Sequence, residues 1–93
     1  MVTITYFNFN LDDGCEELIQ DKGCFGGHLI STKILIADPI RACHDWCRST
    51  SVNFDGYPCC EWHPGSNSCG LWNGVIKSNQ GWFSGLCKGK GER

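Results

Sequence analysis

The architecture of this chain follows from Asp38-Pro39-Ile40-Arg41-Ala42-Cys43-His44-Asp45-Trp46-Cys47. Asp38 is a good helix N-cap, and Pro39 suits the first helical position because its missing N–H needs no partner there. We therefore predict a main helix that starts at Asp38 and ends near residues 48–51. Cys43 and Cys47 lie four residues apart, so both thiols point from one face of this helix.

The cysteine-rich run after this helix predicts a β-hairpin. Pro58 to His63 is typical of a short strand, and Cys69 to Trp72 is typical of a returning strand. Between them, Pro64 to Ser68 contains the proline, glycine, asparagine and serine residues that form turns. The helix and the hairpin together make a frame that disulfide bonds can hold.

The cysteine spacing restricts how this frame is crosslinked. Adjacent strand residues point to opposite faces, so only one of Cys59 and Cys60 faces the helix. Cys43 and Cys47 do not pair comfortably with each other across one helical turn, so each should reach a different strand. We predict the disulfide bonds Cys43–Cys69 and Cys47–Cys60.

The rest of the chain predicts a second helix and further strands. Val2 to Phe9 is rich in β-branched and aromatic residues, which favours a strand. Asp13 and Glu16 resemble a capping box for a short helix over Cys15 to Lys22. Further strands are expected at His28–Ile30, Lys33–Ile36, Val75–Lys77 and Trp82–Cys87, and turns at Cys24–Gly27, Asn73–Gly74 and Ser78–Gly81. We therefore predict an α+β fold in which the main helix and a short N-terminal helix pack on an antiparallel sheet of four or five strands.

Length and composition indicate a secreted protein. The 93 residues form one domain, 1–93, whose glycine-rich and charged tail, 88–93, we expect to be flexible. Eight cysteines in so short a chain indicate a disulfide-rich scaffold, which persists in oxidising compartments. The N-terminus lacks the basic and apolar regions of a signal peptide, so we interpret the chain as a mature form.

Composition also argues against two classes of partner. No apolar stretch approaches the roughly 20 residues that span a bilayer, so we expect no membrane insertion. The net charge is −2 and the basic residues form no stripe, which argues against nucleic acid.

The cysteine pattern resembles the core of the PAN/apple family of extracellular modules. The matching residues are Cys43-x3-Cys47, Cys60 or Cys59, a turn that ends in Cys69, and Leu71 with the aromatic residue after it. The resemblance covers about residues 23–87 and implies one helix on a small antiparallel sheet. It also implies a disulfide bond that closes the ends of the domain, Cys24–Cys87, beside which we pair Cys15 with Cys59. The pairing among these four cysteines stays open, because eight cysteines allow many combinations.

Metal sites and catalytic sites are not expected. The histidines stand alone if disulfide bonds use every thiol, so we predict neither a metal site nor a cofactor. A pair such as Cys60 and His63 would need a free thiolate to act in catalysis. The carboxylates show no spacing that singles out an acid–base pair. We therefore interpret the protein as a non-enzyme.

The aromatic residues are the remaining candidates for function. They either pack on the disulfide bonds or form an exposed platform, since tryptophan and tyrosine recur at protein interfaces and on sugar-stacking surfaces. As candidate ligand-binding residues we name Trp72, Trp82, Phe83, Trp62, Tyr57 and Arg48, with a polar rim of His63, Asn73, Asn79 and Gln80. The resemblance implies a non-catalytic module that binds an extracellular protein, receptor or glycan. The alternative is a stand-alone secreted signalling protein, such as a pheromone, toxin or effector, that acts on a cell-surface receptor.

Overall fold

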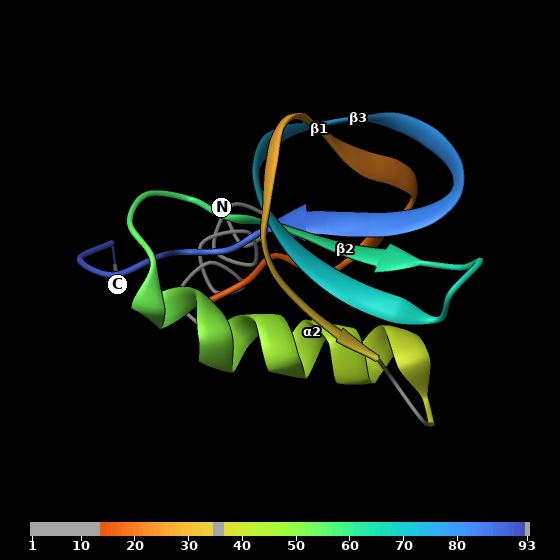
Figure 1. The fold of residues 1–93 in the computed structure, drawn as a ribbon, viewed down its shortest axis with the longest axis horizontal. Coiled ribbons are helices and arrows are strands. Elements are labelled where there is room, and N and C mark those ends of the chain that lie inside the picture. The colour runs from red at the N-terminus through yellow and green to blue at the C-terminus, as the bar shows by residue number, and fades with distance from the viewer. Residues whose placement is uncertain (1–13, 35–36, 93) are drawn as a thin grey trace, which may run out of the picture.

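The computed structural model describes residues 14–34 and 37–92. In chain order it contains β1 (Ile19–Ile34), α2 (Pro39–Thr50), the 3-10 helix η1 (Ser51–Asn53), β2 (Cys59–His63) and β3 (Ser68–Leu86). Helix α2 lies along β2 and the start of β3 (Figure 1). The chain is a small α+β fold, but its described part has one antiparallel sheet of three strands in the order β1-β3-β2. The prediction of four or five strands is therefore wrong.

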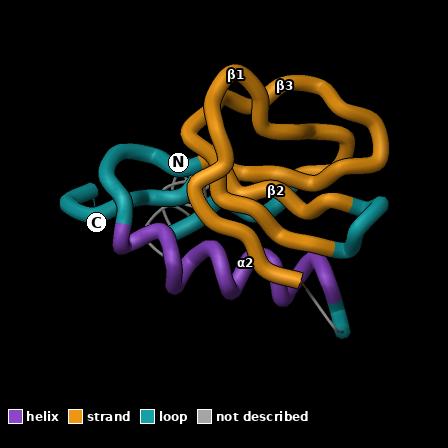
Figure 2. The backbone as a smooth tube through the Cα atoms, viewed as in Figure 1, coloured by secondary structure: helices purple, strands orange, loops and turns teal. Residues whose placement is uncertain are grey.

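The sheet curls because β3 borders β2 on both sides. Cys59 of β2 lies opposite Trp72 in the first half of β3 and opposite Leu86 at its end. Between these two points β3 follows β1 around the bend (Figure 2). A disulfide bond joins β2 to α2 through Cys60, and another joins β2 to β1 through Cys59. Because adjacent strand residues point to opposite faces, α2 and the curled β1–β3 ribbon cover opposite faces of β2.

The turns predicted at Cys24–Gly27 and Asn73–Gly74 are wrong because β1 and β3 stay paired through both segments, with a register shift. A Cβ atom at Gly27 would overlap the carbonyl oxygen of Asn73, and one at Gly74 would lie 2.6 Å from a carbonyl oxygen of β1. These glycines allow two backbones to approach closely at a bulge instead of reversing the chain.

The turn predicted at Ser78–Gly81 is also a bulge. Here β3 loops out opposite Asp21 of β1 and then resumes its pairing. Asp21 adopts a positive φ of 64°, and its Oδ1 accepts the Gly81 N–H at 2.8 Å. The chain bends at this point but does not start a new strand, which is the second reason for the lower strand count.

The short helix predicted over Cys15–Lys22 is wrong. Cys15 forms an isolated antiparallel bridge with Cys87, and β1 occupies the second half of the segment. Glu16, expected to cap a helix, accepts the Leu86 N–H through Oε1 at 2.9 Å and donates its own N–H to the Leu86 oxygen at 2.8 Å. A partner distant in sequence therefore takes the groups that a local helix would have used.

The sequence predicts a strand near the N-terminus and a flexible C-terminal tail. The strand predicted at Val2–Phe9 lies outside the described residues. The tail, predicted to be flexible, is held by backbone hydrogen bonds. The Gly89 N–H donates to the Gly56 oxygen at 2.8 Å, and the N–H groups of Lys88 and Lys90 donate to backbone oxygens of earlier segments.

The predicted main helix is confirmed, since α2 spans Pro39–Thr50. Asp38 occupies the N-cap position, but it has a φ of 46° and its side chain forms no capping hydrogen bond. The Ala42 N–H donates to the backbone oxygen of Asp38 at 2.9 Å. The helix start therefore depends on the Asp38 backbone and on the fixed φ of Pro39.

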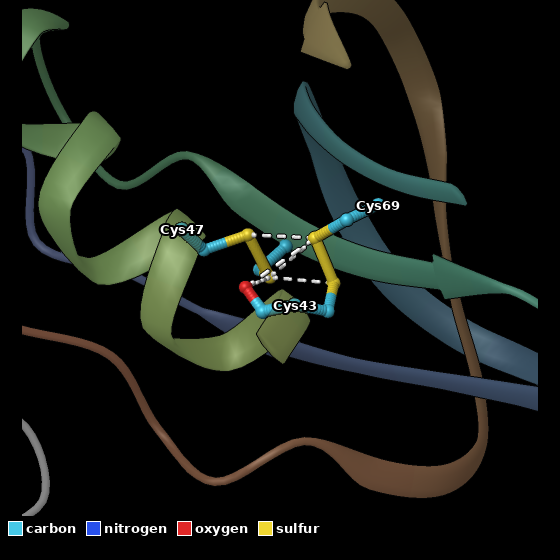
Figure 3. Close-up of side chains that lie close together, drawn as sticks. Cys43, Cys47 and Cys69 are labelled. Atoms are coloured by element: carbon cyan, nitrogen blue, oxygen red, sulfur yellow. Dashed lines mark hydrogen bonds between the residues drawn. A yellow bond between two sulfur atoms is a disulfide. The ribbon is translucent and has the colours of Figure 1, made fainter. Parts of the chain in front are cut away.

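Two disulfide bonds join α2 to the hairpin. They are Cys43–Cys69 and Cys47–Cys60, which are the predicted pairs (Figure 3). All four of these cysteines are fully buried, and with Leu71 they belong to the core between α2 and the sheet.

The other two disulfide bonds correct the sequence-based pairing. They are Cys15–Cys87 and Cys24–Cys59, in place of Cys24–Cys87 and Cys15–Cys59. Cys15 bonds to the residue beside it in the isolated bridge. Cys59 points to the face of β2 away from α2, where the curled ribbon brings Cys24. A bond that closes the ends of the domain exists, but it starts from Cys15.

Candidate functional site

The six predicted ligand-binding residues lie on separate surfaces. Trp62 and Phe83 are cross-strand partners on β2 and β3, and both pack against the disulfide core. Their rings meet edge to face with centroids 5.8 Å apart. The Trp62 Nε1–H donates to Asn67 Oδ1 at 3.0 Å, so the polar atom of this indole already has a partner. These two aromatic side chains therefore serve packing.

Tyr57 and Arg48 lie apart from the remaining tryptophans. Tyr57 is 53% exposed and lines a separate pocket of about 360 Å³. Its hydrogen bond with the Glu92 carboxylate, together with the negative charge there, raises the pKa of the phenol. Arg48 is in the last turn of α2, with its guanidinium 3.7 Å from the Asp45 carboxylate.

Trp72 lines a pocket of about 210 Å³ on the hairpin. Because Trp72 lies opposite Cys59, its side chain is on the face of the sheet turned away from α2. The pocket wall combines one indole, one imidazole, one carboxyl residue and three hydroxyl residues, and consists of Leu29, Thr32, Glu61, His63, Ser66, Ser68, Gly70 and Trp72. The Trp72 indole lies across Gly70, since a Cβ atom at that glycine would be 2.9 Å from Nε1.

His63 connects this pocket with Trp82. The imidazole and indole centroids are 4.1 Å apart, with the rings tilted by 52°. Ser66 Oγ lies 3.5 Å from His63 Nδ1 and 2.7 Å from Ser68 Oγ. We call the surface formed by Trp72, Trp82, His63, Ser66 and Ser68 the tryptophan face. It brings together two of the six predicted residues and one member of the predicted polar rim.

Sequence reasoning missed the hydroxyl groups of this site. Ser66 and Ser68 belong to a segment recognised only as a turn. Thr32 comes from β1, and its Oγ1–H donates to the backbone oxygen of Cys69 at 3.0 Å. Its place in the wall depends on the register between β1 and β3, for which no local signal exists. Asn73, expected in the rim, lines the pocket beside Tyr57 instead.

Glu61 is a buried carboxyl residue at the centre of β2. It is 1% exposed, and its Oε1 accepts the Cys24 N–H at 3.0 Å. Among the described residues, neither its Oε2 nor the hydroxyl of Ser84, its cross-strand partner, has a hydrogen-bond partner. Burial raises the pKa of the Glu61 carboxyl, and the hydrogen bond from Cys24 lowers it in part.

A larger pocket, of about 620 Å³, lies at the start of α2. Its wall includes Phe83 and His44, with charged residues of both signs in Glu17, Asp38 and Arg41. The His44 Nε2 lies 3.4 Å from the Cys15 backbone oxygen. Since its charges oppose one another and Phe83 alone comes from the predicted set, this pocket favours no one class of ligand.

In comparisons with known proteins, no family model, no curated protein and no solved structure matches this chain. The PAN/apple resemblance therefore stays a prediction. Within the described ranges, no helix has both the length and the apolar character needed to cross a bilayer.

Proposed function

We propose that this chain is a non-catalytic extracellular recognition module that binds a glycan through the tryptophan face. The observation that carries the proposal is the meeting of Trp72, His63 and serine hydroxyls around one small pocket. A sugar ring has an apolar C–H face and an edge of hydroxyl groups. An aromatic surface beside hydrogen-bonding groups therefore suits it.

The size of the pocket limits what enters it. At about 210 Å³, it is smaller than the roughly 300–1,000 Å³ typical of pockets that enclose drug-sized ligands. One sugar ring is a suitable occupant, and a longer glycan would continue over His63 onto Trp82. Ser66 and Ser68 hydrogen-bond to each other, but each hydroxyl oxygen retains capacity for a ligand.

The extracellular part of the proposal rests on the four disulfide bonds. Such density of crosslinks is typical of oxidising compartments. The non-catalytic part of the proposal rests on the cysteines. All of them are in disulfide bonds, so none offers a thiolate nucleophile. The His63 ring packs against Trp82 and lies near Ser66 Oγ, and within the described ranges no carboxylate forms an ion pair or hydrogen bond with it that would orient it as a base.

The first test is a titration of ¹⁵N-labelled protein with a panel of neutral oligosaccharides, followed by NMR. We expect the indole N–H signals of Trp72 and Trp82 to shift with at least one sugar, while that of Trp62 stays in place. Trp72→Ala should weaken binding at least about tenfold, as expected for the loss of an aromatic hot spot worth roughly 1.4 kcal/mol or more.

Tyr57→Ala is the matched control, because it also removes an aromatic ring that lines a pocket, but on another part of the surface. Its affinity should equal that of the unchanged protein. The proposal is contradicted if Trp72→Ala, with its fold intact by NMR, binds the sugar as tightly as the unchanged protein does. If no oligosaccharide binds but a cell-surface protein binds through Trp72, the glycan assignment is wrong. The chain is then a secreted signalling protein that acts on a receptor, which is the alternative given above.

A further inference from the structure

The sulfur atoms of the two bonds between α2 and the hairpin form one compact group. The Sγ atoms of Cys43, Cys47, Cys60 and Cys69 all lie within 4.8 Å of one another. Between atoms that are not bonded, the separations are 3.7 Å for Cys43 and Cys60, 3.5 Å for Cys47 and Cys69, and 4.0 Å for Cys60 and Cys69. Figure 3 shows the two disulfide bonds side by side between the helix and the strands.

These separations resemble those of a metal site. In a tetrahedral zinc site the Zn–S distance is about 2.3 Å, so neighbouring sulfur atoms lie about 3.8 Å apart. Three of the four non-bonded separations differ from that edge by a few tenths of an ångström, and the fourth is within 4.8 Å. One helix supplies two of the sulfurs from positions one turn apart, and β2 and β3 supply one each.

We propose that this four-sulfur cluster, once its two disulfide bonds are reduced, binds a single thiophilic divalent cation such as Zn²⁺ or Cd²⁺. Two molecules of a phosphine reductant would each donate two electrons to one disulfide bond and leave as the phosphine oxide, with water supplying the oxide oxygen and the two thiol protons. The cation then displaces the protons from the four thiols and takes all four sulfurs as ligands.

The surroundings of the cluster suit a reduced state. A carbonyl oxygen lies near each of two sulfurs: that of Cys43 is 3.3 Å from Cys69 Sγ, and that of Glu61 is 3.5 Å from Cys43 Sγ. Each carbonyl oxygen can accept a hydrogen bond from a thiol S–H before the metal enters. All four cysteines are fully buried, so water does not compete for the cation.

The test uses the unchanged protein, reduced with a phosphine that does not compete for the metal, and Cd²⁺ as the probe. We expect one Cd²⁺ per chain. With Cd²⁺ at ten times its dissociation constant, iodoacetamide should alkylate these four cysteines about tenfold more slowly, because only the metal-free fraction reacts. Peptide mass spectrometry identifies the protected residues, and Cys15, Cys24, Cys59 and Cys87 are the internal control, alkylated at the same rate with or without Cd²⁺.

Two variants localise the site. Cys43→Ser with Cys69→Ser removes two proposed ligands, and Cys24→Ser with Cys59→Ser removes one disulfide bond outside the cluster. The first should lose at least nine tenths of its Cd²⁺ uptake after reduction, and the second should keep one Cd²⁺ per chain. The proposal is overturned if the reduced chain takes up no Cd²⁺, if all eight cysteines are protected alike, or if both variants lose Cd²⁺ equally. None of these outcomes affects the glycan proposal, which concerns the oxidised protein.

Discussion

Single residues in this protein take partners that neighbouring sequence does not reveal. Glu61 is the clearest example, because an alternating strand normally places a glutamate toward solvent, yet here the curled ribbon covers it. Its carboxyl group has one hydrogen bond, from Cys24, and its pKa is raised. A carboxyl group of this kind makes stability depend on pH in a definite direction.

Because the pKa of Glu61 is higher in the folded than in the unfolded state, the folded protein binds more protons between the two values. The free energy of unfolding contributed by this group is therefore greatest below the ordinary value of about 4.5. It falls as the pH rises through the window up to the raised value, and stays lower above it.

Glu61→Gln should remove the pH-dependent contribution of this carboxyl group to stability. It should raise the free energy of unfolding at neutral pH by about 1 kcal/mol, since the amide keeps the acceptor for Cys24 and avoids a buried charge. Denaturant unfolding from pH 4 to 8, with disulfide bonds intact, measures it. The difference between the two proteins should grow as the pH rises. A constant difference across that range would contradict the assignment of a raised pKa to Glu61.

At the scale of elements, bulges replace turns. Gly27 and Gly74 let β1 and β3 pass closely while they remain paired. Gly27→Ala should lower the free energy of unfolding by about 1–3 kcal/mol, because the new methyl group needs space that the Asn73 carbonyl occupies. Gly65→Ala is the matched control, as it has open space around it, and should change stability by no more than about 0.5 kcal/mol. If the two substitutions change stability equally in thermal unfolding, the strands do not approach each other closely at Gly27.

The elements that could be predicted from sequence are those fixed by local signals. Pro39 and the spacing of Cys43 and Cys47 were enough for α2 and its two bonds to the hairpin. Glu16 and Gly74 carry equally good local signals, for a helix cap and a turn. These failed because distant strands satisfy the same backbone groups within the sheet.

The candidate site was predictable only in Trp72, Trp82 and His63. Residue type marks Trp72 and Trp82 as candidates, but they lie ten positions apart in β3. His63 joins them because β2 pairs with both ends of that strand. This arrangement depends on the register between β2 and both ends of β3, which residue type and spacing do not predict. For the same reason, Trp62 and Phe83 could not be assigned to packing in advance.

The whole molecule is built on one arrangement, in which α2 is bonded to one face of β2 and the curled ribbon is bonded to the other. Mapping the disulfide bonds tests it most directly, by proteolysis without reduction and fragmentation that separates Cys59 from Cys60. We expect the bonds Cys15–Cys87, Cys24–Cys59, Cys43–Cys69 and Cys47–Cys60. A bond from Cys59 to either helix cysteine, or from Cys24 to Cys87, would contradict it.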